Sequence, residues 1–338
     1  MKPSLYMQFP AVLAALVSAV TTAQAAEHWN MSAEQPTSNF ITRIARDFAR
    51  QVKRESKGEL DIRVSPNSTL FKRAQVKDAV ARGDIQVGDL FMSVLSEEDP
   101  LYALDSLPFL VTDYDQAKRL WQVSRPAIEQ RLLQDGVRLL YAVPWPPQSL
   151  YSNKPVTRMA DFQGLKFRSY NPTIARMAEL VGAVPTTIAT EDVPHAFGSG
   201  EVQAMLTSSA TGVDLQAWKF VSHFYDIKAF IPKNITVVNE AAFQRLSDTA
   251  QQALLSAAQR AEMQGWELSW ALNAYQIRTL KRRGLTVAEE APLAIRNGLD
   301  AIGRTLAWEW LAQAGEQGRE IIDEYREGSA KNQAEEVR

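Results

Sequence analysis

A short stretch of this sequence places an arginine where it could bind an anion. Residues 161–172 (DFQGLKFRSYNP) read as a loop, a tight turn, a short strand and the start of a helix. Along the strand, Leu165 and Phe167 point to the side opposite Arg168. Arg168 therefore lies at the carboxyl end of a strand, where open α/β sheets hold their ligands. A guanidinium there can bind a carboxylate through two parallel hydrogen bonds, although an ordinary surface arginine would show the same spacing.

Polar and aromatic side chains gather at the ends of the other predicted strands. They are Phe91, Ser93, Trp145, Gln148, Asn171, Thr207, Ser208, Ser209 and Trp218. Small-molecule sites are mostly apolar clefts with a few fixed polar groups. These residues and Arg168 are therefore the candidate ligand-binding residues. Packing in a core is the alternative for Phe91 and for the two tryptophans.

The sequence offers little for catalysis or for metal binding. The three histidines, His28, His195 and His223, have no spacing that binds a metal, and no G-x-S-x-G, P-loop or dinucleotide-binding pattern occurs. Cysteine is absent, which excludes disulfides and thiolate sites. We therefore expect a protein that is not an enzyme and that uses no cofactor, and no residue pattern indicates a metal site.

Length and composition are those of a globular protein with room for about two domains. Of the 338 residues, 46% are hydrophobic and 22% are charged, and the formal net charge is −2. No run of basic residues is longer than Lys281–Arg283. A nucleic-acid partner is therefore not expected.

Residues 1–25 have the features of a secretory signal peptide. Lys2 supplies a positive charge, residues 9–20 are apolar, and residues 23–25 (AQA) form the small-x-small cleavage pattern. A membrane anchor is the alternative, but the apolar run is shorter than the roughly 20 residues that a span needs. We expect the mature chain to be exported to the bacterial periplasm.

The order of the predicted elements indicates an α/β fold. Strands near residues 27–31, 60–64 and 85–90 alternate with two helices, which end at Gly58 and Gly83. This β-α-β-α-β order favours a mostly parallel sheet with helices on its faces.

Two further features predict a division into two lobes. Three prolines bracket Trp145 and make residues 144–147 a stiff, extended connector. Residues 247–283 hold no proline and keep helical spacing, so this helix would run about 50 Å, longer than one small domain is wide. A coiled coil is the alternative, but no strict heptad continues through the segment. A helix that lies across both lobes fits better.

Several stretches, in their order and spacing, resemble the solute-binding proteins of tripartite ATP-independent periplasmic (TRAP) transporters. The resemblance extends from about Trp29 to Tyr325. It is carried by residues 56–64 (SKGELDIRV), 107–110 (LPFL), 152–156 (SNKPV), 161–168 (DFQGLKFR), 191–200 (EDVPHAFGSG) and 237–239 (VVN). The pair formed by residues 152–156 and 161–168 is the most specific part.

The resemblance implies a two-lobed, periplasmic-binding-protein-like α/β fold with hinge strands and a long helix spanning both lobes. It implies that a small organic acid binds in the cleft, with its carboxylate on Arg168. It also implies delivery to a permease of small and large integral-membrane subunits, powered by an ion gradient. We expect the first lobe to comprise residues 26–149 and 239–280, the second residues 150–238 and 281–326, and a polar tail residues 327–338.

The sequence departs from the family pattern within the expected site. Gln148 falls where many members place a second arginine, and Thr207 falls about where many place an asparagine. Residues 202–208 (VQAMLTS) replace the usual acidic stretch. These departures favour a less charged ligand, a monocarboxylate with hydroxyl, keto or apolar substituents, and Trp145 and Trp218 leave room for an aromatic or branched body.

Other functions fit parts of the same pattern. The chain could serve as the receptor of an ATP-driven transporter, although the long helix argues against it, or as the ligand-sensing partner of a membrane signalling protein. A secreted hydrolase is the alternative from another class, and it would depend on His195 or His223.

Overall fold

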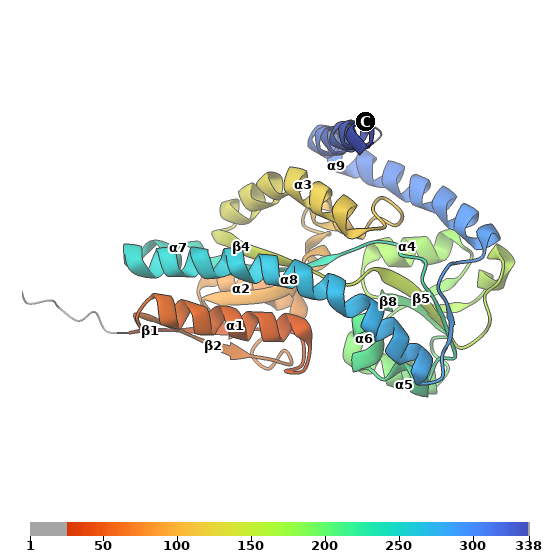
Figure 1. The fold of residues 1–338 in the computed structure, drawn as a ribbon, viewed down its shortest axis with the longest axis horizontal. Helices are drawn as coiled ribbons and strands as arrows, with labels where there is room; N and C mark the ends of the chain where they lie inside the picture. Colours follow the sequence, from red (N-terminus) through yellow and green to blue (C-terminus); the bar gives the residue numbers. More distant parts are fainter. Residues whose placement is uncertain (1–25, 337–338) are drawn as a thin grey trace, which may run out of the picture.

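The computed structural model describes residues 26–336 and shows two β-sheets, each flanked by helices (Figure 1). The predicted signal peptide lies outside the described residues. The first sheet has the strand order β2 (Leu60–Ser65), β1 (Glu27–Ser32), β3 (Val87–Phe91), β10 (Lys233–Asn239) and β4 (Val137–Pro144). Strand β1 runs parallel to β2 and β3, whereas β10 is antiparallel to both its neighbours.

The second sheet holds the strand that carries Arg168. Its order is β11 (Thr286–Ala288), β9 (His223–Tyr225), β5 (Gln148–Ser152), β8 (Ala204–Ser208), β6 (Lys166–Ser169) and β7 (Val184–Thr187). Strand β6 runs parallel to β7 and β8, while β5 is antiparallel to β8 and β9. The predicted two-lobed α/β fold is confirmed.

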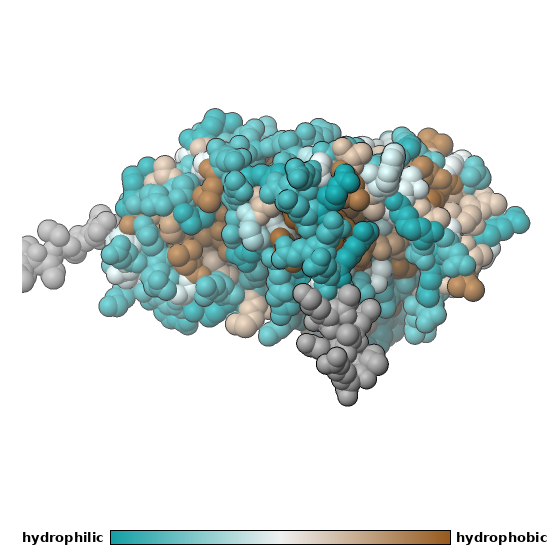
Figure 2. Space-filling model, turned by 90° about the horizontal axis from the view of Figure 1, so that it is seen from above, coloured by the Kyte–Doolittle hydropathy of each residue, from teal (hydrophilic) through white to brown (hydrophobic). Residues whose placement is uncertain are grey.

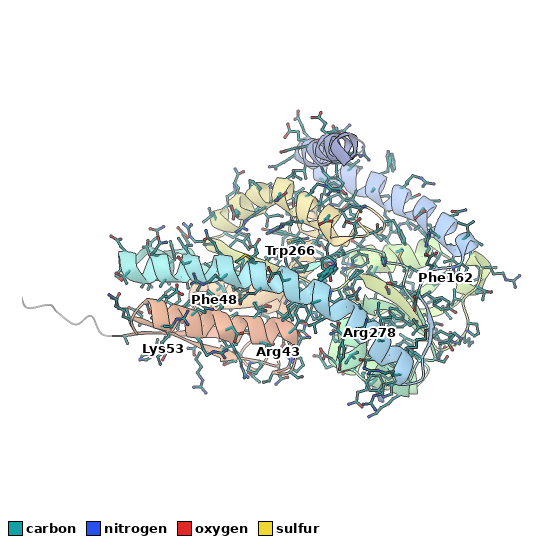
Figure 3. All side chains as sticks on the ribbon, in the orientation of Figure 1. Arg43, Phe48, Lys53, Phe162, Trp266 and Arg278 are labelled. Carbon is teal, nitrogen blue, oxygen red and sulfur yellow. The ribbon has the colours of Figure 1, made fainter. Side chains whose placement is uncertain are left out.

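Helices cover the sheets and bury an apolar core in each lobe. The α-helices are α1 (Phe40–Glu55), α2 (Val76–Arg82), α3 (Tyr114–Gln134), α4 (Pro172–Leu180), α5 (Val193–Gly198), α6 (Ser209–Asp214), α7 (Glu240–Gln244), α8 (Asp248–Arg282) and α9 (Leu293–Glu336). Short 3-10 turns include η1 (Arg73–Gln75), η2 (Met92–Leu95), η3 (Pro100–Ser106), η4 (Met159–Phe162), η5 (Thr190–Asp192) and η6 (Ala217–Lys219). Phe48 belongs to the core of the first lobe and Phe162 to that of the second (Figure 3).

Two extended segments carry the chain between the sheets, side by side. The backbone N–H of Trp145 donates to the carbonyl of Pro232 (2.8 Å), and that of Gln148 donates to the carbonyl of Phe230 (2.8 Å). The segment that returns to the first lobe continues directly into β10, which pairs with β3 and β4. Residues 233–238 therefore lie in the first sheet, not in the second lobe as predicted from sequence, and the lobe boundary that we propose falls within residues 229–232.

Helix α8 runs along both lobes, as predicted (Figure 1). It packs against α1 and β4 in the first lobe and against α6 and β11 in the second. Its 35 residues correspond to about 50 Å. The close approach to β4 occurs at Gly265, where an added Cβ would lie 2.6 Å from Cγ2 of Val143.

Helix α9 also joins the two lobes. Ile295 and Leu299 pack into the second-lobe core, whereas Ile321 and Ile322 pack into the first-lobe core beside α3. The two halves meet at Gly315, whose non-helical backbone (φ 65°, ψ −147°) bends the chain. Helix α9 continues through the segment expected to be a polar tail, as far as Glu336, because good helix formers follow Gly328.

The surface seen from above is mostly hydrophilic, with smaller hydrophobic patches between (Figure 2). Among residues 26–336, no helix combines the length and the apolar character that crossing a membrane requires.

Replacing Gly265 should loosen the contact between α8 and β4. We expect Gly265→Ala to lower the free energy of unfolding by up to about 2 kcal/mol. Overpacking of the new methyl group against Val143 costs about 1–3 kcal/mol, and the better helix propensity of alanine offsets about 1 kcal/mol of that cost. Urea unfolding measures the change. Gly198→Ala in α5, where a Cβ meets open space, is the control. Equal stability of the two variants would contradict the prediction.

Candidate ligand-binding site

Arg168 is a buried cation at the carboxyl end of β6. Its side chain is only 2% exposed, although it leaves the strand on the side opposite Phe167, which lies in the second-lobe core. Its Nε donates to the backbone carbonyl of Ile188 (3.0 Å), and its Nη2 donates to the Thr190 hydroxyl (3.3 Å). The loop after β7 therefore holds one edge of the guanidinium in place.

No carboxylate within residues 26–336 pairs with Arg168, and its Nη1 makes no hydrogen bond with the described chain. Burial lowers the pKa of Arg168 to about 10, and the nearby Arg73 guanidinium acts in the same direction. The group remains charged at neutral pH. A buried charge without a counter-ion is unfavourable, so this site is prepared to gain an anion.

A narrow cavity of about 30 Å³ borders Arg168 between the lobes. It is lined by Gln35, Arg73, Phe91, Trp145, Gln148, Arg168, Tyr170, Thr190, Thr207 and Thr211. Residues from the first lobe, from the second lobe and from the crossing segment all contribute. Three aromatic rings, three hydroxyl-bearing threonines and two amides surround the two guanidiniums, which is a composition suited to a small, partly apolar anion.

Aromatic and amide groups fix the wall of the cavity next to Arg168. The Tyr170 ring lies 4.6 Å from the Arg168 guanidinium and packs edge to face on Phe91 of the first lobe. The Tyr170 hydroxyl donates to Gln148 Oε1 (3.2 Å), and Gln148 Nε2 donates to the carbonyl of Pro146 (3.0 Å). The amide of Gln148 is thus oriented by both its neighbours.

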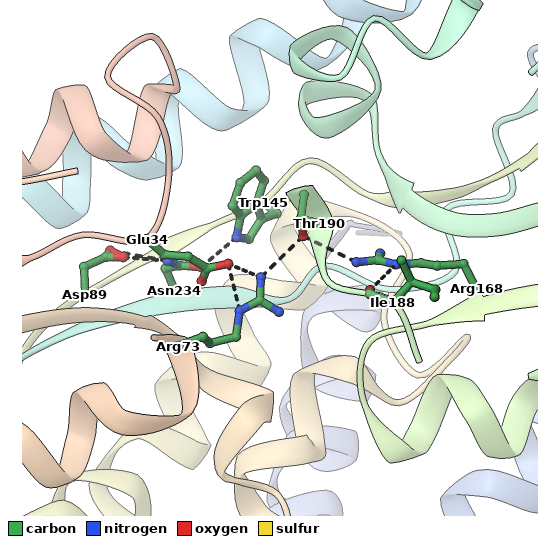
Figure 4. Close-up of polar contacts among 8 residues, drawn as sticks. All are labelled: Glu34, Arg73, Asp89, Trp145, Arg168, Ile188, Thr190 and Asn234. Atoms are coloured by element: carbon green, nitrogen blue, oxygen red, sulfur yellow. Dashed lines mark hydrogen bonds and ion pairs between the residues drawn. The ribbon is translucent and has the colours of Figure 1, made fainter. Parts of the chain in front are cut away.

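A second arginine reaches the cavity from the first lobe (Figure 4). Arg73 Nε donates to Glu34 Oε1 (2.7 Å), and Arg73 Nη2 forms an ion pair with the same carboxylate. The same Nη2 lies 3.5 Å from the Thr190 hydroxyl, which also accepts from Arg168. Thr190 thereby links the two guanidiniums across the lobes and keeps its own proton available for a ligand.

A chain of hydrogen bonds links the Trp145 indole, through Asn234, to Asp89 (Figure 4). Its Nε1 donates to Asn234 Oδ1 (2.8 Å), and Asn234 Nδ2 donates to the two carboxyl oxygens of Asp89 (2.5 and 3.3 Å). Burial raises the pKa of Asp89 to about 7. The indole donor fixes the orientation of the Asn234 amide, and the amide in turn fixes the indole.

The structure brings half of the sequence-predicted residues to the cavity: Arg168, Gln148, Trp145, Thr207 and Phe91. Asn171 and Ser93 instead bond to each other across the lobes, with Nδ2 donating to Oγ over 2.9 Å. Ser208 caps α6, and Ser209 bonds to Asn273 and Gln276 of α8. Trp218 lies apart from the cavity, against the Arg283 guanidinium at 5.3 Å.

Five cavity residues were not among the sequence predictions: Gln35, Arg73, Tyr170, Thr190 and Thr211. Tyr170 could have been found, because it follows Arg168 by two residues and so shares its side of an extended chain. Gln35 follows β1 closely, in the position where parallel strands present ligand contacts. Arg73 and Thr190 carry no local signal, since only the packing of the two lobes brings them together.

The histidines take no part in this site. His223 Nδ1 lies 2.8 Å from the Ser222 hydroxyl, its ring stacks on Tyr225, and neither it nor His195 borders the cavity. In the described part of the chain, no group of three His, Asp or Glu side chains is placed to hold a metal ion.

Two lobes, crossing segments and an interlobe cavity around an arginine that no carboxylate of the described residues pairs with define a periplasmic-type solute-binding protein. The chain belongs to the bacterial extracellular solute-binding proteins of family 7, whose sequence pattern matches residues 31–303. The predicted membership of the TRAP solute-binding proteins is thereby confirmed.

Solved structures and curated relatives agree with this assignment. DctP7, a Bordetella pertussis extracytoplasmic solute receptor binding pyroglutamic acid, is 45% identical, with a TM-score of 0.87 over 89% of this chain and 100% of that one. A marine metagenome TRAP protein specific for pyroglutamate is 33% identical, with a TM-score of 0.86 over 89% and 99%. A solute-binding protein of Albidiferax ferrireducens is 26% identical over 180 residues, and this match spans 53% of each chain, about half its length.

The raised pKa of Asp89 should make stability depend on pH. Between about pH 4 and pH 7 the unfolded chain loses this proton while the folded protein keeps it. The free energy of unfolding should therefore fall as pH rises through this window, and Asp89→Asn should flatten the decline. Urea unfolding from pH 4 to pH 8 measures it, with Asp84→Asn at an exposed position as control. Parallel curves for wild type and Asp89→Asn would refute the assignment.

Proposed function

We propose that this protein is an extracytoplasmic receptor that binds a small organic monocarboxylate between its lobes and delivers it to a TRAP permease. The observation that carries the proposal is the buried guanidinium of Arg168, which has a free edge facing the cavity and no counter-ion in residues 26–336. A carboxylate ligand would neutralise this charge and accept two hydrogen bonds from it.

Acids of the pyroglutamate type fit the proposal best. Three structural neighbours above 30% identity bind pyroglutamate, and the groups that line the cavity suit such a ligand. One carboxylate would meet Arg168, the amide groups of Gln35 and Gln148 would meet a carbonyl or N–H, and a small ring would lie among Phe91, Trp145 and Tyr170. The narrow cavity favours a small acid over a polymer or a long chain.

Contacts between the lobes support a mechanism of closure around the ligand. Asn171 bonds to Ser93, and Asn39 Nδ2 donates to Asp214 Oδ2 over 2.6 Å across the lobes. These bonds form only when the lobes approach, and closure removes water from the ion pair of ligand and Arg168. Attraction between the charges then increases because the local dielectric constant falls, so the ligand shifts the population toward the closed state.

Membership of the family supports delivery of the ligand to a membrane permease. We infer export to the periplasm through the predicted signal peptide and release of the acid to a permease of small and large integral-membrane subunits, driven by an ion gradient. Both lobes of the closed form present surface for recognition, and α8 and α9 extend across them.

Arg168 should be decisive for binding and dispensable for folding. We expect Arg168→Ala to lose at least ~2 kcal/mol of binding free energy, about 30-fold in Kd, and Arg168→Lys also to bind poorly because the planar fork is lost. Isothermal titration with pyroglutamate measures both. The melting temperature of ligand-free Arg168→Ala should not fall, since an unpaired buried charge is removed.

Arg158→Ala, an exposed arginine outside the cavity, is the matched control and should bind like wild type. Wild-type affinity in either Arg168 variant would overturn the role of Arg168. Mass spectrometry of the recovered acid separates a receptor from a hydrolase, because a receptor returns its ligand unchanged.

A further inference from the structure

Two arginines line the cavity, and among residues 26–336 a counter-ion pairs with Arg73 but not with Arg168. Glu34 follows β1, and its Oε1 receives both hydrogen bonds that Arg73 directs to this carboxylate. Its other oxygen, Oε2, is buried without a hydrogen-bond partner. Arg73 is thus the one cation paired with Glu34 among the described residues, and the carboxylate is committed to it.

The charges that border the cavity, together with Glu34, therefore sum to one unpaired positive charge among the described residues; Asp89, bonded to Asn234 behind Trp145, does not border it. Arg73 and Glu34 cancel, Tyr170 stays neutral because burial raises its pKa, and Arg168 remains. The buried pair Lys233–Asp105, joined over 3.3 Å, is neutral as a unit. Glu191 also acts on both arginines, but it is exposed, so water screens it.

We propose that Glu34 sets the charge of the ligand: by neutralising Arg73 inside the protein, it restricts the site to acids with a single negative charge. This inference rests on the proposed function and names the ligand class more closely. Arg73 then serves the ligand as a hydrogen-bond donor to a neutral oxygen, because its Nη1 makes no hydrogen bond within residues 26–336.

Electrostatics gives the reason for the restriction. A monocarboxylate brings the closed cavity to neutrality, whereas a dicarboxylate leaves one buried negative charge without a partner, which is costly. Without the charge of Glu34, two neighbouring guanidiniums would face the cavity. The dicarboxylate would then be the ligand that restores neutrality.

Glu34→Gln tests this, because glutamine keeps the shape and the acceptor oxygen for Arg73 but removes the charge. Isothermal titration is done with glutaramate and glutarate, which differ only in an amide against a second carboxylate, and with pyroglutamate as reference. We expect wild type to prefer glutaramate at least 10-fold, and Glu34→Gln to reduce or reverse this ratio by at least 10-fold.

The double variant Glu34→Gln/Arg73→Gln removes the ion pair as a unit and should bind both acids more weakly while keeping the wild-type order of preference. A ratio unchanged in Glu34→Gln, with folding verified by circular dichroism, overturns the assignment of Glu34. A ratio that shifts in the single variant and stays shifted in the double variant overturns the part played by Arg73.

If Glu34→Gln does not fold, the double variant is compared with Arg73→Gln. Arg73→Gln leaves Glu34 unpaired and should lose binding of every anion, whereas the double variant should still bind both acids weakly. This difference decides the question. Wild-type protein that binds none of the three acids overturns the proposed function itself.

Discussion

The uncompensated charge of Arg168 is the constraint on which the rest of the site depends. A guanidinium that is 2% exposed would be expelled or paired in an ordinary core, yet here a backbone carbonyl, a threonine hydroxyl and the Tyr170 ring hold it without a carboxylate from residues 26–336. Each of these neighbours is dipolar or polarisable. They therefore partly stabilise the positive charge of Arg168 but do not neutralise it. The folded protein thus carries an electrostatic cost that an anion relieves.

The other cavity walls are rigid because their polar groups are bonded to one another. Trp145 is fixed through Asn234 to Asp89, and Gln148 is fixed between Tyr170 and Pro146. Side chains that are already ordered lose little entropy when a ligand arrives. Little of the binding free energy is therefore lost in ordering the side chains of the site.

The sequence predicted the parts of this structure that local patterns encode. Alternation identified β6 and with it Arg168, and the proline-free apolar periodicity identified α8. Strand β7 was missed because its proline argues against a strand, and β9 was missed because its three residues, His-Phe-Tyr, do not alternate between apolar and polar side chains. Arg73, Glu34 and Thr190 come from separate segments that meet only when the lobes pack together. Trp218 was misplaced because an aromatic residue after a polar cluster fits a pocket wall and a packing site equally well.

Within residues 26–336, four segments connect the lobes: residues 145–147, residues 229–232, α8 and α9. A single tether would let one lobe twist and slide against the other. Two crossing segments bonded side by side, with a long helix along one flank and the bent α9 along another, restrict twisting and favour a hinge motion of one lobe against the other. The lobes must then meet in the same alignment at each closure. The connections between the lobes therefore fix the direction of closure. Arg73 on the first lobe and Thr190 on the second return to the same contact each time.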